Sequence, residues 1–300
     1  MQKKRVVLAL GGNALTTKHN FSYETQLNQI EKTAKIVADL VKKDYLITIT
    51  HGNGPQVGSI LLQNETPPSM PIDVCGAESQ AQIGYMLQQA LKNEFAKRRI
   101  KKDTVTLITQ ILVETKDPAF KTPSKPIGPF YSRQQIIKFK HKYRFKLIPG
   151  KGFRRVVPSP EPKDIIELDL IKKLANDVVV ICCGGGGIPV IKEGKDLAGV
   201  RAVIDKDKAA ALLANKLKAD ILLILTDVDA VYKNYNTSGQ EKLAELSPAT
   251  ARCYLVDGQF PEGSMGPKIE AAIAFKKKSI ITTIDKAELA LQGKAGTVIA

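Results

Sequence analysis

Apolar segments that end in glycine-rich or small polar loops recur along this chain of 300 residues. Residues 6–10 run into Gly11 and Gly12, residues 46–50 run into the loop 52–54, and residues 178–181 precede four consecutive glycines at 184–187. A fourth apolar run, 221–225, ends in the polar sequence 226–229. Ligands of open parallel sheets bind beyond the carboxyl ends of the strands, where glycines let backbone N–H groups approach an anion. The loops therefore predict a sheet edge that binds a large, highly charged ligand, such as a nucleotide phosphate tail with a phosphoryl acceptor.

Amphipathic segments alternate with these apolar runs. The apolar spacing predicts helices at residues 22–43, 76–99, 163–174, 206–217 and 266–277, and one further strand at residues 105–113. In the first of these helices Ile30, Ala34 and Val37 share one face, and we expect Ser22 to be the N-cap. This alternation predicts a three-layer α/β/α sandwich with a mainly parallel central sheet.

The alternation breaks at Asp117-Pro118. From there to Pro162 the chain is basic, proline-rich and irregular, with only weak strand signals at 144–148 and 155–157. Such a stretch is too long for a plain connection in a compact domain. We therefore expect a small protruding subdomain, residues 117–162, inserted in a first domain of residues 1–217 and followed by a second domain of residues 218–300.

The positive charge of the chain is concentrated in the same stretch. The whole chain has a formal net charge of +15, and residues 117–155 contain eleven cations against one acid, Asp117, a net of +10. Three interpretations remain open for these cations: a solvated lysine-rich face, a funnel for small anions, or a surface that binds nucleic acid. Lysine outnumbers arginine here, which favours the solvated face, because arginine is the better residue for phosphate forks.

Composition excludes several other classes of protein. A hydrophobic content of 43% with no apolar run of the ~18–20 residues needed to span a bilayer indicates a globular chain without a membrane segment. The first residues lead directly into a strand, so we expect no signal peptide. Three histidines cannot support much metal binding, and no Ser-His-Asp set is apparent. The four cysteines lack metal-ligand spacing, which favours reduced thiols in the cytoplasm; they are Cys75, Cys182, Cys183 and Cys253.

Three lysines have contexts that favour phosphoryl chemistry. Lys125 lies between two prolines, Lys206 between two aspartates, and Lys268 at the start of a predicted helix. A lysine in the first turn of a helix is electrostatically misplaced unless an anion is bound there, although any one such lysine is more often a solvated surface residue. Phosphoryl transfer needs backbone donors and lysines around the moving group, and Asp207 could hold Lys206 and Lys268 in place.

Eight motifs along the chain resemble the amino acid kinase family and, within it, the branch that phosphorylates carbamate. They occur in order at residues 10–15, 50–57, 125–131, 156–160, 183–190, 203–207, 226–232 and 263–268. Many members of the family have a lysine just before the first glycine pair, where this chain has Ala9. The carbamate-specific branch resembles this chain in lacking that lysine and in taking one from the subdomain, which here would be Lys125.

The resemblance implies the reversible reaction of ATP with carbamate to give ADP and carbamoyl phosphate. The family usually runs this reaction towards ATP, as the last step of arginine or agmatine fermentation. It implies Mg²⁺ held mainly by the nucleotide phosphates, with no protein metal site, and a homodimer without nucleic-acid or membrane partners. The first domain would bind the carbamoyl moiety, the second the nucleotide, and the subdomain would act as a lid.

The resemblance also assigns roles to individual residues. Carbamate is already an anion, so in-line transfer would need no general base. The catalytic group would be Lys206 and Lys268 on the transferring phosphoryl group, Lys125 on the acceptor side, and Asp207 orienting the lysines. Donors to carbamoyl phosphate would be Gly11, Gly12, Asn13, Gly52, Asn53 and Gly54. The nucleotide would be bordered by Gly185, Gly186, Thr226, Asp227, Tyr232, Met265 and Lys268.

Two alternatives stay open from the sequence alone. The first is a kinase of another small carboxylate in the same family, and the second is a nucleic-acid-binding protein that uses the basic insertion. No zinc spacing, aromatic RNA-binding motif or recognition helix supports the second.

Overall fold

An eight-stranded sheet forms the centre of the computed structural model, which describes residues 3–12, 15, 22–65, 67–139, 141, 143–261 and 263–300. All neighbouring strands in this sheet are parallel except the pair β16–β17. The strand order is β15 (Glu245–Leu246), β17 (Thr297–Ile299), β16 (Lys278–Thr283), β12 (Ile221–Thr226), β1 (Arg5–Leu10), β2 (Leu46–His51), β9 (Val178–Ile181) and β3 (Asp103–Thr106). The mainly parallel sheet predicted from the sequence is confirmed.

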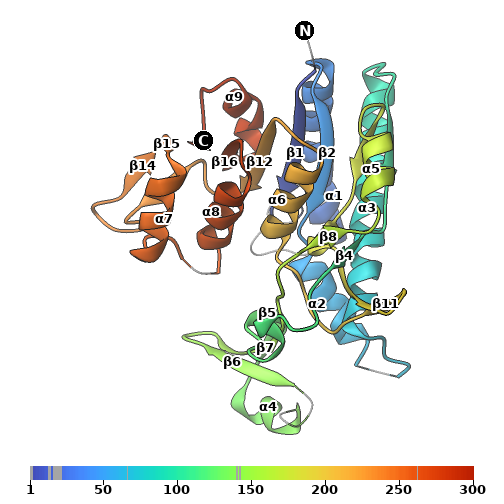
Figure 1. Ribbon diagram of the computed structural model, residues 1–300, viewed down its shortest axis with the longest axis vertical. Helices are drawn as coiled ribbons and strands as arrows, with labels where there is room; N and C mark the ends of the chain where they lie inside the picture. The colour runs from blue at the N-terminus through green and yellow to red at the C-terminus, as the bar shows by residue number, and fades with distance from the viewer. Residues whose placement is uncertain are drawn as a thin grey trace.

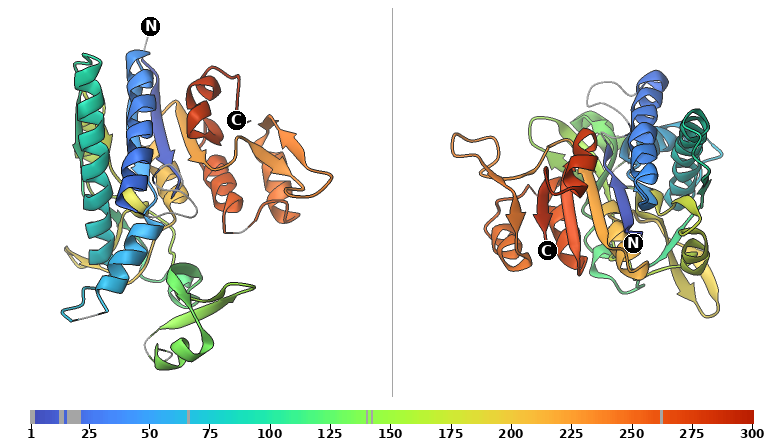
Figure 2. Two further views of the ribbon diagram at one scale, coloured as in Figure 1. Left: turned by 180° about the vertical axis from the view of Figure 1, so that it is seen from behind. Right: turned by 90° about the horizontal axis from the view of Figure 1, so that it is seen from above.

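Helices cover both faces of the sheet, as Figures 1 and 2 show. One face packs on α1 (Tyr23–Lys42), α3 (Ile72–Lys97) and α9 (Ala287–Leu291). The other face packs on α5 (Leu168–Leu174), α6 (Lys206–Lys216), α7 (Pro248–Val256) and α8 (Met265–Ala274). The predicted three-layer arrangement is therefore the observed one.

The side chains of β1 explain why this sheet must be covered twice. Val7 and Ala9 belong to the core on the α6 and α8 side, whereas Val6, Leu8 and Leu10 belong to the core on the α1 and α3 side. Successive side chains of a strand point to opposite faces, so a strand that is apolar throughout is stable only between two layers. All five side chains are completely buried.

Helix starts agree with the sequence where a capping residue is present. The Ser22 side chain accepts a hydrogen bond from the backbone N–H of Thr25, and α1 begins at Tyr23. The helix predicted for residues 76–99 begins earlier, at Ile72, because its start follows Pro71 rather than a polar cap. The strand predicted for residues 105–113 is wrong as a single element.

Two sheets share that segment. β3 ends at Thr106, and the chain then turns into β4 (Gln110–Leu112), which joins a second sheet of β11 (Asp196–Gly199), β10 (Ile188–Glu193), β4 and β8 (Asp164–Ile165). The turn is held by the side chain of Gln80, which accepts from the Thr109 N–H at 2.8 Å and donates to the Thr109 carbonyl at 3.1 Å. Apolar spacing alone does not reveal such a change of sheet.

The subdomain is a three-stranded antiparallel sheet of β5 (Lys125–Tyr131), β7 (Gly152–Val157) and β6 (Arg144–Ile148) with α4 (Arg133–Phe139). Figure 1 shows it projecting from the end of the molecule opposite the N-terminus, next to α2 (Gly54–Gln63). Its aromatic side chains pack edge to face, with the ring of Tyr131 5.5 Å from Phe145 and 6.2 Å from Phe139. The protruding subdomain was expected, but β5 and α4 were not, since prolines and lysines mask their periodicity.

Two glycines of α3 test how closely this helix approaches β3. A methyl group at Gly84 would lie 2.2 Å from the Thr106 methyl, whereas nothing lies within 4 Å of a methyl group at Gly76. We predict that Gly84→Ala lowers the free energy of unfolding by about 1–3 kcal/mol through overpacking. Gly76→Ala should raise it by up to about 1 kcal/mol, because alanine favours the helix. Urea denaturation followed by circular dichroism measures both free energies of unfolding. Equal changes in the two variants would contradict the close approach of α3 to β3.

Candidate active site

The glycine loops meet at one edge because β12, β1, β2 and β9 are neighbours in the sheet. The Gly11 N–H donates to the Leu225 carbonyl at 2.9 Å, and the Gly52 N–H donates to the Leu10 carbonyl at the same distance. A Cβ at Gly11 would lie 2.6 Å from the Leu225 oxygen. Glycine is therefore required at position 11 for two strand ends to be joined this closely.

The loop after β9 packs under the loop after β2. Gly185 and Gly186 have positive φ angles of 65° and 93°, a left-handed conformation that favours glycine. A Cβ at Gly185 would lie 2.1 Å from the side-chain amide of Asn53, and one at Gly186 would lie 2.4 Å from the Ile204 carbonyl. These two glycines, predicted to border a nucleotide, thus lie between the Asn53 loop and the start of α6.

A buried carboxylate joins two of the three singled-out lysines. Asp207 accepts from Lys206 at 2.6 Å through one oxygen and from Lys268 at 3.2 Å through the other. The side chains are almost fully enclosed, with 5% of Asp207, 12% of Lys206 and 14% of Lys268 exposed. Lys206 opens α6 and Lys268 lies in the first turn of α8, so the carboxylate brings two helix N-termini together.

The pKa values of this cluster follow from burial and charge. Burial alone would raise the pKa of Asp207, but the two ammonium groups outweigh it and lower the pKa to about 2. The pKa of Lys206 is lowered, first by burial and further by repulsion from Lys268, against the attraction of Asp207. Two cations that share a single anion leave a net positive charge at the sheet edge.

Lys125 reaches the same helix from the subdomain. Its ammonium donates to Asp205 at 2.6 Å. Asp205 is also the N-cap of α6 and accepts from the Asp207 N–H at 2.9 Å. Burial raises the pKa of Asp205, but the charge of Lys125 outweighs this and lowers it overall. Sequence reasoning placed Asp205 beside Lys206 but missed its pairing with Lys125, which is 80 positions away.

A basic cleft of about 780 Å³ separates the subdomain from the starts of α6 and α8. Its lining includes Lys125, Lys146, Lys151, Arg154 and Lys208. Part of the charge concentrated in residues 117–155 thus lines the cleft that contains the Lys125–Asp205 pair, next to the lysine cluster of Lys206, Lys268 and Asp207. This position favours the anion-funnel interpretation of the sequence for these side chains.

A second pocket, of about 340 Å³, lies beyond β12, and Thr226, Asp227, Tyr232 and Met265 line it with seven other residues. The Tyr232 hydroxyl donates to Asp229 at 2.5 Å, and this bond raises the pKa of Tyr232 to about 12. Lys242 and Lys286 also donate to Asp229, at 2.8 and 2.9 Å, and hold its pKa far below the usual range. Asp229 therefore fixes the aromatic ring in the pocket, a role that the sequence did not reveal.

The structure thus gathers the predicted residues along one edge in three groups. Lys125, Lys206, Asp207 and Lys268 lie by the basic cleft, and Thr226, Asp227, Tyr232 and Met265 line the second pocket. Gly11, Gly12, Gly52 and Asn53 lie at the ends of β1 and β2, and Gly54 is the first residue of α2. Asn13 lies outside the described residues.

This geometry stabilises negative charge. His51, at the end of β2, is buried, and burial chiefly lowers its pKa to about 4, so it is neutral at pH 7. Among the described residues, no group of three or more His, Cys, Asp or Glu side chains could hold a metal ion. No helix in the described part of the chain is long and apolar enough to cross a membrane.

Comparisons with known proteins agree with this geometry. A model described as the amino acid kinase family matches residues 4–284. A carbamate kinase of Pyrococcus furiosus is 47% identical over 310 aligned positions, and the alignment covers 99% of each chain. The structure of a carbamate kinase from Giardia lamblia bound to AMP-PNP matches with a TM-score of 0.92 and 45% identity, over 99% of this chain and 98% of that one. A UMP kinase from Bacillus anthracis, 15% identical with a TM-score of 0.57, shares the fold alone.

The buried histidine generates a pH prediction. The folded-state pKa of His51, about 4, is below the unfolded value of about 6.5. Between these values the unfolded chain binds more protons, so stability falls as the pH falls. From pH 7 to pH 5 the contribution of His51 to the free energy of unfolding should drop by about 2 kcal/mol. His51→Gln should remove that loss.

Urea unfolding at the two pH values measures the effect. His141 is exposed and gives a matched control, since His141→Gln should keep the pH dependence of the wild type. An unchanged acid loss in His51→Gln would assign it to other groups.

Proposed function

Because the chain belongs to the amino acid kinase family, we propose that it is a carbamate kinase, which transfers a phosphoryl group between ATP and carbamate. The observation that carries this proposal is the meeting of Lys206 and Lys268 on Asp207, with Lys125 delivered to the adjacent Asp205 by the subdomain. Relatives that are named carbamate kinases and are 45–47% identical over their whole length support it.

The chemistry needs no proton transfer. A carbamate oxygen forms a bond to the γ-phosphorus while the bond from that phosphorus to the β,γ-bridging oxygen breaks, and the electron pair leaves with ADP. Carbamate is already an anion, so its attack on phosphorus would need no general base. The barrier then arises from bringing two anions together, and positioned cations lower it.

Each lysine takes one part of this task. Lys206 and Lys268, at the starts of two facing helices, would contact the transferring phosphoryl group, and Asp207 would hold their spacing. Lys125 would contact the carbamate side. Backbone N–H groups of the loops at Gly11, Gly12, Gly52, Asn53 and Gly54, with Asn13, would bind carbamoyl phosphate. Gly185 and Gly186 would border the nucleotide and would also support the Asn53 loop.

The pocket lined by Thr226, Asp227, Tyr232 and Met265 would bind the nucleoside, beside the Lys268 helix. Mg²⁺ would enter as part of the nucleotide substrate, because both oxygens of Asp207 are engaged by lysines and the described residues form no other carboxylate cluster. A Mg²⁺ ion bound to the nucleotide phosphates would neutralise part of their negative charge.

Ala9 supports carbamate over other acceptors of the family. It lies in β1 before the glycine pair and is fully buried on the α6 side, so the first strand provides no ammonium group to the site. Lys125 provides one instead, from a subdomain that is separate from the main sheet. We accordingly propose residues 1–217 as the carbamoyl-binding domain, with residues 117–162 as a lid, and residues 218–300 as the nucleotide-binding domain.

The cellular setting follows from the same proposal. We place the protein in the cytoplasm, where its four free cysteines would stay reduced and where it would form ATP at the end of arginine or agmatine breakdown. A homodimer is supported by the surface of α3, where Tyr85 is 63% exposed and lines a hollow with Ile108 of the β3–β4 connection, which is 44% exposed. Exposed apolar side chains that lie together on one surface favour an interface.

Turnover tests the role proposed for Lys206. Lys206→Ala should lower kcat for ATP formation from ADP, Mg²⁺ and carbamoyl phosphate by about 10²–10³-fold, the scale of one lost donor to a developing anion. A coupled hexokinase and glucose-6-phosphate dehydrogenase assay measures it. Lys216→Ala, at the other end of α6, should retain wild-type turnover. Near-wild-type turnover of Lys206→Ala would refute the role of this lysine, and inactive wild-type protein that binds ADP would refute the carbamate assignment.

A second prediction separates nucleotide binding from chemistry. Asp229→Asn should raise the KM for ADP several-fold with kcat within about twofold, because Tyr232 loses its charged anchor but the lysine cluster is untouched. Asp257→Asn, at the exposed end of α7, gives the matched control. A fall in kcat at unchanged KM would contradict a positioning role for Asp229.

A further inference from the structure

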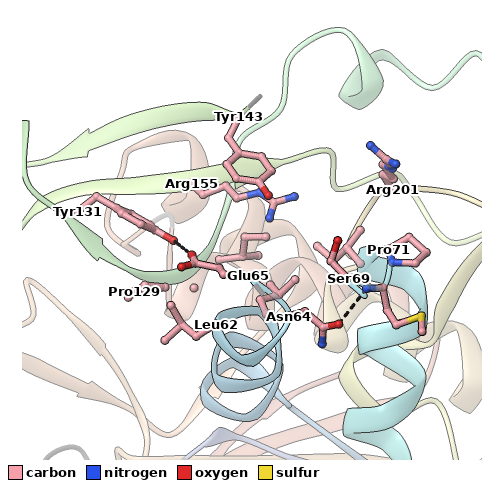
Figure 3. A pocket seen from close by; sticks show the side chains of 15 residues that line it. Leu62, Asn64, Glu65, Ser69, Pro71, Pro129, Tyr131, Tyr143, Arg155 and Arg201 are labelled. Carbon is pink, nitrogen blue, oxygen red and sulfur yellow. Dashed lines mark hydrogen bonds between the residues drawn. The ribbon is translucent and has the colours of Figure 1, made fainter. Parts of the chain in front are cut away.

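A second pocket near the subdomain lies between the end of α2, the start of α3 and the face of the subdomain sheet that does not line the basic cleft (Figure 3). Its volume is about 220 Å³. Its polar lining includes Glu65 and Ser69 from the α2–α3 connection, Tyr131, Tyr143 and Arg155 from the subdomain, and Arg201 from the connection after β11. We call it the corner pocket.

Strand alternation separates the corner pocket from the cleft. Arg154 and Arg155 are successive residues of β7, so their side chains point to opposite faces of the small sheet. Arg154 lines the basic cleft, and Arg155 lines the corner pocket. The pocket is at the far end of α2 from Gly54, about 13 Å along a helix of this length. None of the residues assigned to phosphoryl transfer lines it.

Two guanidinium groups line this pocket, those of Arg155 and Arg201. Arg155 lies over the ring of Tyr143, with its guanidinium carbon 3.8 Å from the ring centroid, which fixes the plane of the group. Neither Arg155 nor Arg201 forms an ion pair with any residue that the structure describes. The pKa of Arg155 is lowered, first by burial, and the positive charge of Arg201 contributes. A partly buried cation near a second cation is stabilised when an anion binds between them.

One carboxylate opposes them. Glu65 lines the pocket, and the Tyr131 hydroxyl donates to it across 3.5 Å, a weak contact. Two guanidiniums against one carboxylate still leave an excess positive charge. A planar guanidinium held on an aromatic ring presents paired N–H donors that match the two oxygens of a carboxylate or phosphate. The hydroxyl of Ser69 adds a neutral donor on the pocket lining.

We propose that the corner pocket is a binding site for a small oxyanion, carried by a carboxylate or phosphate metabolite, held between Arg155 and Arg201. This site would tie the subdomain to the α2–α3 connection. It is independent of the proposed reaction, since it shares no residue with the lysine cluster.

Isothermal titration calorimetry of the full chain at pH 7, with succinate and with inorganic phosphate as separate probes, tests the site. At least one probe should bind with a Kd of about 0.1–1 mM. Arg155→Lys keeps the charge but loses the fork, and should weaken binding about tenfold. Arg201→Met should weaken it several-fold, and Glu65→Gln should strengthen it, because a like charge is removed. Arg252→Met, on the exposed side of α7, is the charge-matched control and should change nothing.

Titration of the Lys206→Ala variant shows whether the measured heat of binding comes from the corner pocket or from the lysine cluster. Binding that persists in Lys206→Ala and falls in Arg155→Lys supports the corner pocket, with succinate or phosphate preference naming the headgroup. Binding lost in Lys206→Ala, binding unaffected by Arg155→Lys, or no binding of either probe would overturn the proposal. Thermal unfolding of every variant without probe shows whether the fold is retained.

Discussion

The buried carboxylate of Asp207 is the interaction on which the rest of the site depends. Two lysines stand in the first turns of α6 and α8, where the helix dipole opposes a cation. Burial would make the charged form of both ammonium groups still less favourable. Asp207 offsets these costs by accepting from each of them, and in doing so it fixes the distance between two helices that are 61 positions apart in sequence. The positive charge that remains is directed towards the sheet edge, where the glycine loops expose backbone donors. Without Asp207, repulsion between Lys206 and Lys268 would move the two ammonium groups apart. The positive charge would then no longer be concentrated at the sheet edge.

Much of this arrangement could be read from the sequence, for identifiable reasons. Strands such as β1 are apolar throughout, and Gly11 follows one directly, so the parallel sheet and its loop-lined edge leave a local signal. Asp207 stands beside Lys206 in the chain, so their pairing was also local. Contacts formed only by folding left none: Asp205 with Lys125, and Asp229 with Lys286, join residues 80 and 57 positions apart. The single strand expected for residues 105–113 failed because the Gln80 side chain, on a different element, holds the turn at Thr109.

The subdomain is small but both of its faces are used. Its strands are held by edge-to-face aromatic pairs instead of a large apolar core. Lys125 opens β5 on the cleft side, and Tyr131 ends the same strand beside the corner pocket. Prolines at positions 126 and 129 restrict the backbone between them, and Gly128 lies against Gly58 of α2. One strand thus connects the cleft side of the subdomain with the corner pocket and contacts α2 between them.

The ion pair between Lys125 and Asp205 has a consequence for the exchange of anions at the proposed site. Asp205 is anchored by capping α6, so it cannot follow the subdomain if the subdomain moves. Under the role proposed for Lys125, an incoming anion would take the lysine from this carboxylate, and a departing anion would return it. Lys125 would therefore always be paired with an anion. The binding free energy that Lys125 contributes would be only the difference between its interaction with the ligand and its interaction with Asp205. A site with permanently unpaired cations would bind its products tightly and release them slowly. Because Asp205 competes with the bound anion for Lys125, the free energies of binding and of release would both be small.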